Sequence, residues 1–326
     1  MTQARVVRIE QAGAPEVMQI VTVDLPAPEA GEVRVAQAAI GFNYIDTYQR
    51  SGYYPIPMPG GLGFEAAGTV EAIGPDVADI AVGDRVAYMN AGVGAYASHR
   101  NVPADKLVKL PEAVSFEQAA SLIFKGMTAQ YLVRRTHKVQ PGDIVLVHAA
   151  AGGVGQILSR WAKALGATVI GTAGSSAKCE AARAAGCDAA IDYSQDDWVQ
   201  QVIDATGGTK ARVVYDSVGK HTFLGSLDCA APFGLVVLYG AASGPAPAIE
   251  PDILNKKGCL FLTRPSVFPH NADPQVFREN AREVMDAIVA GTVDAPIGAR
   301  YALDEVVEAH RAAEARKTTG AIVLIP

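Results

Sequence analysis

Hydrophobic positions in the first third of the chain fall in short runs that are rich in β-branched residues. The runs cover Val6–Ile9, Glu32–Ile40, Ala66–Ile73 and Asp84–Tyr88, and Gly and Pro separate them. This pattern is typical of short antiparallel strands. Gly and Pro also crowd Ser51–Gly63, which predicts a surface loop with a fixed path. We therefore expect a β-rich domain here.

The pattern changes at residue 115. The segment 115–136 has helical spacing, and Ser115 is its expected N-cap, with Gln118 three residues on. Strands and helices then alternate, as in a parallel sheet covered by helices. The expected strands are Ile144–His148, Thr168–Thr172, Ala189–Asp192, Val213–Asp216, Leu235–Tyr239 and, as a sixth, Cys259–Thr263. The expected helices are Gly153–Leu165, Ser176–Ala185, Asp197–Ala205 and His221–Ala230. The sequence thus predicts a sheet of Rossmann type.

The last part of the chain differs again. It predicts helices over Pro274–Ala290 and Leu303–Glu314, and strands over Ala299–Ala302 and Ala321–Ile325. A strand that follows a complete Rossmann sheet is most simply placed in the N-terminal domain. The predicted fold is therefore α/β, with a nucleotide-binding Rossmann domain inserted in a split β-rich domain.

A glycine-rich turn joins the strand Ile144–His148 to its helix. It reads Ala150-x-Gly152-x-x-Gly155, which matches G-x-G-x-x-G with Ala in the first place. Such a turn is tight, lets a pyrophosphate approach the backbone, and presents the N–H groups and positive dipole of a helix N-terminus. The context of strand, turn and helix favours a dinucleotide site. A tight turn that holds no ligand is the alternative.

The end of the second strand distinguishes NAD from NADP. An NAD site places an acidic residue roughly 20 residues after the turn, but residues 171–176 read GTAGSS. Small hydroxyls and Gly amides accept a 2′-phosphate that a carboxylate would repel. Lys178 follows as a phosphate partner, and Glu180 is expected on another face of the helix. NADPH is the predicted cofactor, with Lys178 as an ordinary solvated lysine the alternative interpretation.

Composition adds limits on compartment and partners. The length of 326 residues favours about two domains, and a net charge of −6 gives no general attraction to nucleic acid or anionic lipid. The cysteines, Cys179, Cys187, Cys229 and Cys259, form no metal-ligand spacing and are expected to be buried thiols. The N-terminus lacks the apolar run of a signal peptide, and no stretch approaches the ~20 apolar residues of a membrane span. A cytoplasmic protein is expected.

The chain resembles the quinone oxidoreductase (zeta-crystallin-like) branch of the zinc-independent medium-chain dehydrogenase/reductase superfamily. The segments that carry the resemblance are Asn43–Pro55, Gly61–Val77, Val82–Tyr88, Phe124–Leu132, His148–Gln156, Arg212–Gly219 and Leu262–Ser266. The resemblance implies a GroES-like catalytic domain, 1–126 and 267–326, and a Rossmann NADPH-binding domain, 127–266. It also implies a homodimer formed through the Rossmann sheets and transfer of hydride or electrons from NADPH to a quinone.

The resemblance further implies roles for individual residues. Those expected near the nicotinamide are Asn43, Tyr48 and Thr128. Those expected to line the rest of the cofactor are Gly152, Gly153 and Val154 at the pyrophosphate, Ser175, Lys178 and Tyr193 at the 2′-phosphate, and Ser217, Tyr239, Gly240, Thr263, Arg264, Pro265 and Arg316 elsewhere.

Ligands for zinc are missing from the expected positions. Zinc alcohol dehydrogenases of this superfamily have a Cys within the segment that here is Gly41–Tyr48, and a His where this chain has Phe64; neither ligand is present. Glu65 alone cannot hold zinc and is expected to be structural. Alcohol–carbonyl exchange needs a Lewis acid, whereas a reduced quinone spreads its charge into an aromatic ring. A metal-free quinone reductase is therefore favoured.

Two alternatives remain at this point. An NADPH-dependent enone or alkenal double-bond reductase would need a proton donor at carbon, for which Tyr48, Tyr54 and Asp46 are candidates, although each also has an ordinary structural interpretation. A structural or RNA-binding crystallin-like protein is the alternative of another class. His148 is expected to be a hydrogen-bonded core histidine.

Overall fold

The computed structural model describes residues 2–294, 296–315 and 318–326. The chain divides into two compact units. The first unit consists of Met1–Lys125, Asn271–Val289 and Ala295–Pro326, and the second of Gly126–His270 and Ala290–Asp294. The domain boundaries expected from the sequence remain a prediction.

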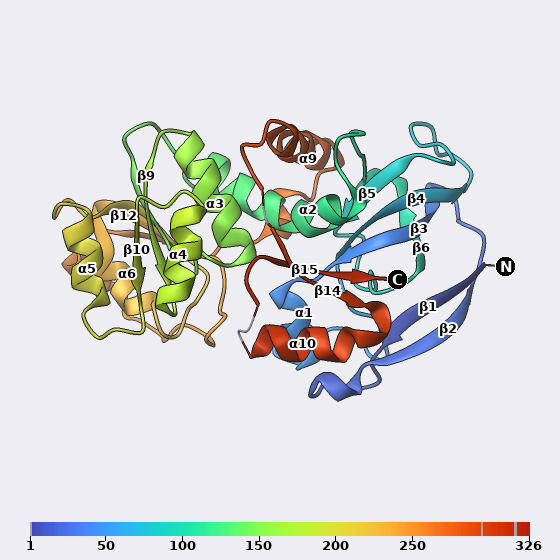
Figure 1. Cartoon of the computed structure of the whole chain (residues 1–326), viewed down its shortest axis with the longest axis horizontal. Helices are drawn as coiled ribbons and strands as arrows, with labels where there is room; N and C mark the ends of the chain where they lie inside the picture. The colour runs from blue at the N-terminus through green and yellow to red at the C-terminus, as the bar shows by residue number, and fades with distance from the viewer. Residues whose placement is uncertain (1, 295, 316–317) are drawn as a thin grey trace. The chain divides into compact units, whose positions relative to one another are not determined.

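The first unit contains a mixed sheet in the order β14-β15-β3-β4-β5-β7, with β6 also paired to β3 (Figure 1). Its strands are β3 (Glu32–Gly41), β4 (Glu65–Ile73), β5 (Arg85–Met89), β6 (His99–Pro103), β7 (Leu107–Lys109), β14 (Ile297–Ala302) and β15 (Ala321–Ile325). β15 pairs antiparallel with β3, so the closing strand does return to the N-terminal sheet. β1 (Thr2–Arg8) and β2 (Gln19–Leu25) form a separate antiparallel pair.

Helices α1 (Tyr44–Arg50), α9 (Pro274–Val289) and α10 (Val306–Glu314) belong to the same unit. Val306 and Ala309 of α10 join Ile40 of β3 and Leu324 of β15 in one buried cluster. The single helix predicted for Leu303–Glu314 is wrong in detail: Leu303–Glu305 is a 3-10 turn. The side chain of Glu305 accepts a hydrogen bond from the Ala302 N–H at 2.8 Å, which closes that turn before α10 begins.

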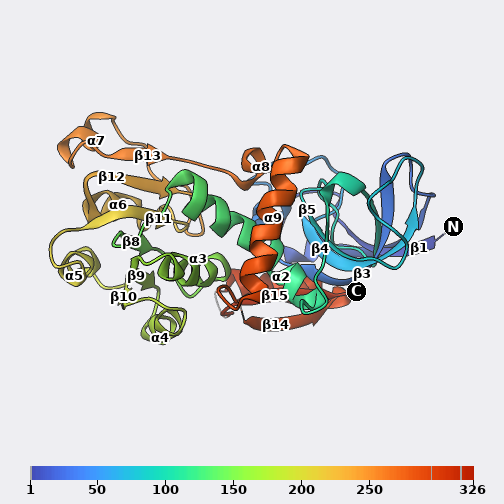
Figure 2. The same ribbon diagram turned by 90° about the horizontal axis from the view of Figure 1, so that it is seen from above.

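The second unit is a parallel sheet in the order β10-β9-β8-β11-β12-β13, with helices on both faces (Figures 1 and 2). Its strands are β8 (Ile144–Val147), β9 (Thr168–Ala173), β10 (Ala189–Asp192), β11 (Ala211–Asp216), β12 (Ala230–Leu238) and β13 (Phe261–Thr263). Its helices include α3 (Gly153–Ala164), α4 (Ser176–Ala184), α5 (Trp198–Ala205), α6 (Phe223–Cys229), α7 (Asp252–Lys256) and α8 (Val267–His270). The strand order reverses at β8, which is where a doubly wound sheet forms its ligand crevice.

Three expectations about the second unit need correction. β13 begins at Phe261 rather than Cys259, because Cys259 adopts a left-handed backbone with φ 54° that cannot continue a strand. Cys259 is also exposed, whereas Cys179, Cys187 and Cys229 are buried thiols as expected. Helix α6 is shorter than the predicted His221–Ala230, since the chain turns at Gly219, where φ is 84°, before the helix starts.

Helix α2 (Phe116–Tyr131) begins in the first unit and ends in the second. The predicted cap is present: Ser115 Oγ accepts from the Gln118 N–H at 3.1 Å, and Gln118 Oε1 accepts from the Ser115 N–H at 3.0 Å. A π-helical turn, Leu132–Thr136, ends the helical segment. The reciprocal cap therefore sets where this long helix starts.

Candidate functional site

The glycine turn between β8 and α3 is shaped by one close approach. Ala149 takes the left-handed conformation, with φ 52°, and Gly152 is the N-cap of α3. A Cβ added at Gly155 would lie 2.3 Å from Ala149 O and 2.8 Å from Ala150 Cα. Only glycine at position 155 lets the helix pack this tightly against the turn.

The turn also fits a pyrophosphate. A Cβ added at Gly152 would meet only Ala149 O, at 3.1 Å, so the backbone at Gly152 is not covered by other parts of the described chain. Gly153 and Val154 follow as the first residues of the 12-residue helix α3. The first N–H groups of a helix have no partner within it and are suited to bind an anion.

The residues expected at a 2′-phosphate lie together after β9. Ser175 caps α4, and its Oγ accepts from the Lys178 N–H at 3.4 Å. The Tyr193 hydroxyl covers Gly174, since a Cβ added there would be 3.0 Å from the Tyr193 oxygen. Glu180 pairs instead with Arg183 on the same helix, Oε1 to Nη1 at 2.5 Å. The cluster thus combines a hydroxyl, a phenol and a lysine, and the carboxylate of Glu180 on the same helix is paired with Arg183.

The other expected cofactor residues lie at the carboxyl ends of β11, β12 and β13. Tyr239 N donates to Asp216 O at 2.8 Å, and a Cβ added at Gly240 would be 2.5 Å from Ser217 O. Thr263 ends β13 beside Val237 of β12, and Arg264 and Pro265 come next. Carboxyl ends of parallel strands share one edge of a sheet, so these residues and the glycine turn belong to the same edge.

Thr128 is a buried residue of α2 in the second unit. Arg316 lies outside the described residues.

His148 is buried beneath the glycine turn and is hydrogen-bonded at both ring nitrogens. Its Nδ1 lies 2.7 Å from Thr172 Oγ1 and its Nε2 lies 3.0 Å from Ser226 Oγ. Ser226 Oγ donates to Asp216 Oδ2 at 2.8 Å, so we assign the ring proton to Nε2, which donates to Ser226. Burial lowers the pKa of His148. A neutral imidazole linking β8, β9 and α6 fits the expected core role.

In the first unit, Asn43 and Glu65 are directly bonded. Asn43 Nδ2 donates to Glu65 Oε1 at 2.7 Å, the Phe124 N–H donates to Oε2 at 2.6 Å, and Lys125 Nζ lies 3.1 Å from Oε1. Glu65 is fully buried. Its carboxylate is therefore occupied by an amide, a backbone N–H and an ammonium, which suits the expected structural role. Among the described residues, no group of three or more His, Cys, Asp or Glu side chains is placed to hold a metal.

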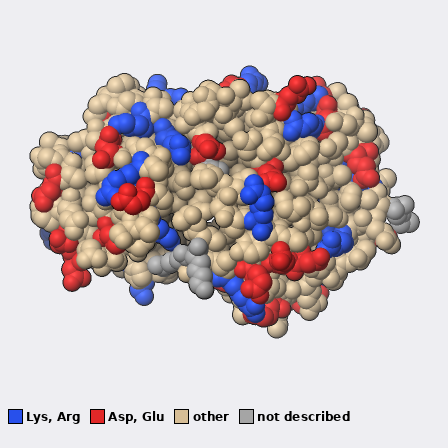
Figure 3. Space-filling model, in the orientation of Figure 1, with Lys and Arg blue, Asp and Glu red and all other residues tan. Residues whose placement is uncertain are grey.

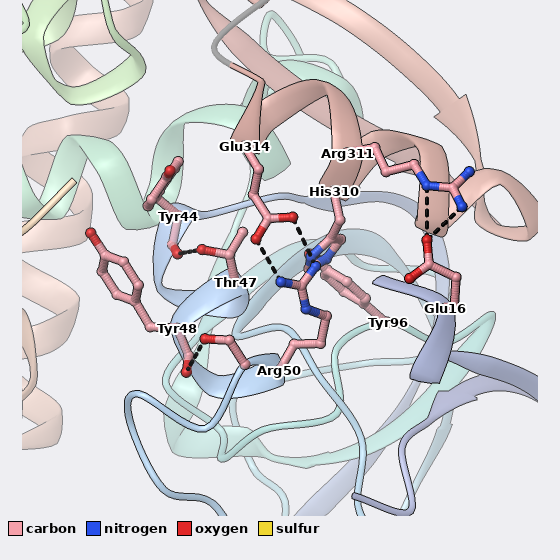
Figure 4. Close-up of polar contacts among 10 residues, drawn as sticks. Glu16, Tyr44, Thr47, Tyr48, Arg50, Tyr96, His310, Arg311 and Glu314 are labelled. Atoms are coloured by element: carbon pink, nitrogen blue, oxygen red, sulfur yellow. Dashed lines mark hydrogen bonds and ion pairs between the residues drawn. The ribbon is translucent and has the colours of Figure 1, made fainter. Parts of the chain in front are cut away.

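Asp46 belongs to a buried polar cluster that links α1 to α10, and Figure 4 shows its members Tyr96 and His310. Its Oδ2 accepts from the Asn43 N–H at 2.9 Å and from the Tyr96 hydroxyl at 2.8 Å, and the Tyr96 oxygen lies 3.3 Å from His310 Nε2. Burial raises the pKa of Asp46 to about 7 and lowers the pKa of His310 to about 3. With none of its surface exposed, Asp46 cannot touch an acceptor, so it caps α1 rather than donating a proton to substrate.

A second contact between the same helices is a two-pronged ion pair. Arg50 Nη1 and Nη2 lie 3.0 and 2.5 Å from the two carboxylate oxygens of Glu314 (Figure 4). Arg50 is buried. This pair and the Asp46–Tyr96–His310 chain hold the helix that follows Asn43 in place.

The fold and the site define a class of protein. A GroES-like unit and a parallel Rossmann unit with a dinucleotide turn are the architecture of the medium-chain dehydrogenases/reductases. Residues 29–112 match the alcohol dehydrogenase GroES-like domain and residues 153–284 match the zinc-binding dehydrogenase family.

Proteins with similar sequences indicate one branch of this superfamily. The chain is 45% identical to a quinone oxidoreductase of Pseudomonas aeruginosa, over 99% of this chain and 100% of the relative. It is 43% identical to a 2-haloacrylate reductase of Burkholderia sp, over 98% of each. The crystal structure of Escherichia coli quinone oxidoreductase complexed with NADPH superposes with a TM-score of 0.96 at 44% identity, covering 99% of this chain and 100% of that one. The chain belongs to the quinone oxidoreductase branch of the medium-chain superfamily, as the sequence predicted.

Sequence reasoning missed the residues that support the site from a distance. Lys125 lies 60 residues from Glu65, Tyr96 lies 50 from Asp46, and His310 lies 214 from Tyr96. No spacing or motif signals such pairs, because they meet only through the fold.

The raised pKa of Asp46 predicts how the stability of the folded protein depends on pH. Its folded-state pKa of about 7 exceeds the usual 3.8, so the folded state binds this proton more tightly than the unfolded chain does. Its contribution to stability is therefore lost as pH rises from about 4 to about 7. Asp46→Asn cannot titrate, so the stability of the variant relative to wild type should increase between pH 5 and pH 8, by an amount on the order of a few kcal/mol at most.

Urea unfolding of both proteins at the two pH values measures this difference, and any pH-independent cost of the substitution cancels. Asp84→Asn is the matched control. Hydrogen bonding to Lys109 lowers the pKa of Asp84, so Asp84 is ionised in both the folded and the unfolded state between pH 5 and pH 8, and the stability of its variant relative to wild type should not change over this rise. An Asp46→Asn difference that does not change with pH would contradict the assignment.

Proposed function

We propose that the protein is an NADPH-dependent oxidoreductase that reduces quinones. The observation that carries the proposal is the joint placement, at one sheet edge, of the dinucleotide turn and the cluster of Ser175, Lys178 and Tyr193. Its family membership supports the quinone as acceptor. When bound, NADPH supplies a hydride.

The residues proposed to hold the cofactor fall into three groups. Gly152, Gly153 and Val154 would bind the pyrophosphate through their backbone, and Ser175, Lys178 and Tyr193 the 2′-phosphate. The remaining proposed contacts are Asn43, Thr128, Ser217, Tyr239, Gly240, Thr263, Arg264, Pro265 and Arg316.

The residues proposed to face the reacting atoms are Asn43, Tyr48, Tyr54 and Thr128. Asn43 is held at its backbone N–H by Asp46 and at its side-chain amide by Glu65, which fixes the orientation of its carboxamide. Preorganised groups of this kind contribute by positioning the acceptor and excluding water. Reduction of a quinone needs no proton at carbon, so none of these side chains must act as a general acid in the transfer itself.

We propose that the reaction proceeds without zinc. Phe64 and the Cys-free segment Gly41–Tyr48 offer no soft ligands. Glu65 already has the Lys125 ammonium at 3.1 Å, so a second cation beside it would be repelled.

Enone or alkenal reduction is the second candidate function. The family relationship to a 2-haloacrylate reductase favours it, because that name denotes a substrate with a carbon–carbon double bond. In this reaction a proton must reach carbon, and Tyr48 or Tyr54 would supply it.

The proposed setting is the cytoplasm, without nucleic acid or membrane as partner. Within the described part of the chain, no helix is long and apolar enough to cross a bilayer. On the face shown in Figure 3, Lys and Arg side chains are scattered among acidic ones rather than gathered in one basic surface. The net charge of −6 also disfavours the RNA-binding alternative.

NADPH oxidation with a panel of quinones, enones and alcohols tests the function. Quinones should give the highest kcat/KM and simple alcohols with NADP⁺ should give none. Chelator treatment should leave the rate unchanged, with no stoichiometric zinc in the same sample. A preference for enones would favour the second candidate, and loss of activity on chelation would overturn the metal-free proposal.

Replacing Lys178 tests the choice of cofactor. Lys178→Ala should raise KM for NADPH and leave KM for NADH nearly unchanged, because only NADPH carries the 2′-phosphate. A charge-assisted contact of ~1.5–3 kcal/mol predicts roughly a ten- to hundredfold loss of preference. Lys178→Arg retains the charge and should retain most of the preference. Equal effects on both cofactors would show that Lys178 is only structural.

We also propose a homodimer formed through the Rossmann sheets. The strand β13 is at one end of the sheet order, and it exposes 62% of Phe261 and 37% of Leu262. An apolar edge strand is a template for pairing with a second chain. Phe261→Asp should therefore shift the protein from dimer to monomer in sedimentation velocity, whereas Val82→Asp, at an equally exposed residue of the other unit, should not. A monomeric wild type would refute the proposal.

A further inference from the structure

Four tyrosines of the first unit form one aromatic cluster around Tyr48. Tyr44 and Tyr48 are one turn apart on α1 and project from the same side of it (Figure 4). The ring of Tyr48 lies 5.3 Å from Tyr44, 5.4 Å from Tyr53 and 5.3 Å from Tyr54, edge-on in each case. Tyr53 and Tyr54 are stacked, with centroids 4.9 Å apart and planes at 25°. These spacings are those of attractive aromatic pairs.

The loop after α1 is built to bring Tyr53 into this cluster. The Ser51 N–H donates to Thr47 O at 2.9 Å and the Tyr54 N–H donates to Tyr48 O at 3.0 Å, so the chain turns back onto the helix. Gly52 makes the turn with φ 83°, a conformation that favours glycine. These backbone hydrogen bonds and the turn at Gly52 therefore fix the position of Tyr53.

Tyr53 differs from the other three in exposure. Its side chain is an exposed large aromatic, at 44%, while Tyr44, Tyr48 and Tyr54 are half-buried. Tyr53 is thus the outer member of the cluster that contains both proposed catalytic tyrosines.

We propose that Tyr53 is a specificity-determining residue that selects planar acceptors with two or more fused rings. This inference rests on the proposed quinone reductase function. A fused-ring quinone that reacts beside Tyr48 and Tyr54 extends its outer ring over Tyr53 and gains an aromatic contact there. A single-ring quinone ends before reaching it.

The test compares 1,4-benzoquinone, 1,4-naphthoquinone and 9,10-phenanthrenequinone with wild type, Tyr53→Leu and Tyr53→Phe. Loss of one aromatic pair in Tyr53→Leu should raise KM for phenanthrenequinone roughly three- to tenfold. The rise should be smaller for naphthoquinone and absent for benzoquinone, with kcat unchanged. Tyr53→Phe keeps the ring and should behave as wild type. The benzoquinone rate and the KM for NADPH report whether either variant has disturbed the fold.

Each other result decides against the inference. Unchanged KM values in Tyr53→Leu, or equal changes for all three quinones, would show that Tyr53 does not distinguish acceptors by their number of fused rings. Equal losses in Tyr53→Phe and Tyr53→Leu would show that the hydroxyl, not the stacked ring, is responsible. Failure of the proposed function itself is a separate result, in which the wild type reduces none of the three quinones.

Discussion

The buried carboxylate of Glu65 is the interaction on which the geometry of the first unit depends. It joins three segments: β4, which carries it, the Asn43 residue that precedes α1, and the Phe124–Lys125 stretch of α2. A fully buried charge is costly unless it is paired and hydrogen-bonded, and here an ammonium and two N–H donors meet that need. The approach is so close that a Cβ at Gly41 would lie 2.2 Å from Glu65 Oε1. Glu65 therefore fixes the orientation of the Asn43 side-chain amide.

A second carboxylate holds the other side of Asn43. Asp46 binds the Asn43 N–H and, through Tyr96, reaches His310 of the C-terminal helix α10. The same burial moves the pKa of Asp46 up and that of His310 down, because each group is held away from the water that would stabilise its charge. The ion pair of Arg50 with Glu314 ties these helices again. Residues that are far apart in the chain thus together hold α1 and its tyrosines in place.

In the second unit the corresponding constraint is steric. Gly155 lets α3 approach Ala149 and Ala150, and Gly174 leaves room for the Tyr193 hydroxyl beside Ser175. The buried His148 joins β8, β9 and α6 below the turn. A rigid base of this kind keeps backbone N–H groups pointed at one place, which is what a turn that binds phosphate needs.

The sequence by itself determined the Rossmann alternation, the capped start of α2, the dinucleotide turn and the lack of an acid after β9. Each of these features depends on residues that lie a few positions apart in the chain. Hydrophobic periodicity, helix capping and the conformational freedom of glycine all act over that short range. The tertiary structure alone decided that Tyr44–Arg50 is a helix, that β2 and β6 are strands, and that Glu65 meets Lys125. It also decided that Asp46, Tyr96 and His310 form one chain and that Tyr53 stacks on Tyr54 at the outer margin of its cluster. A seven-residue helix is too short to be stable alone, and buried polar groups find distant partners only when the fold brings them together and excludes water.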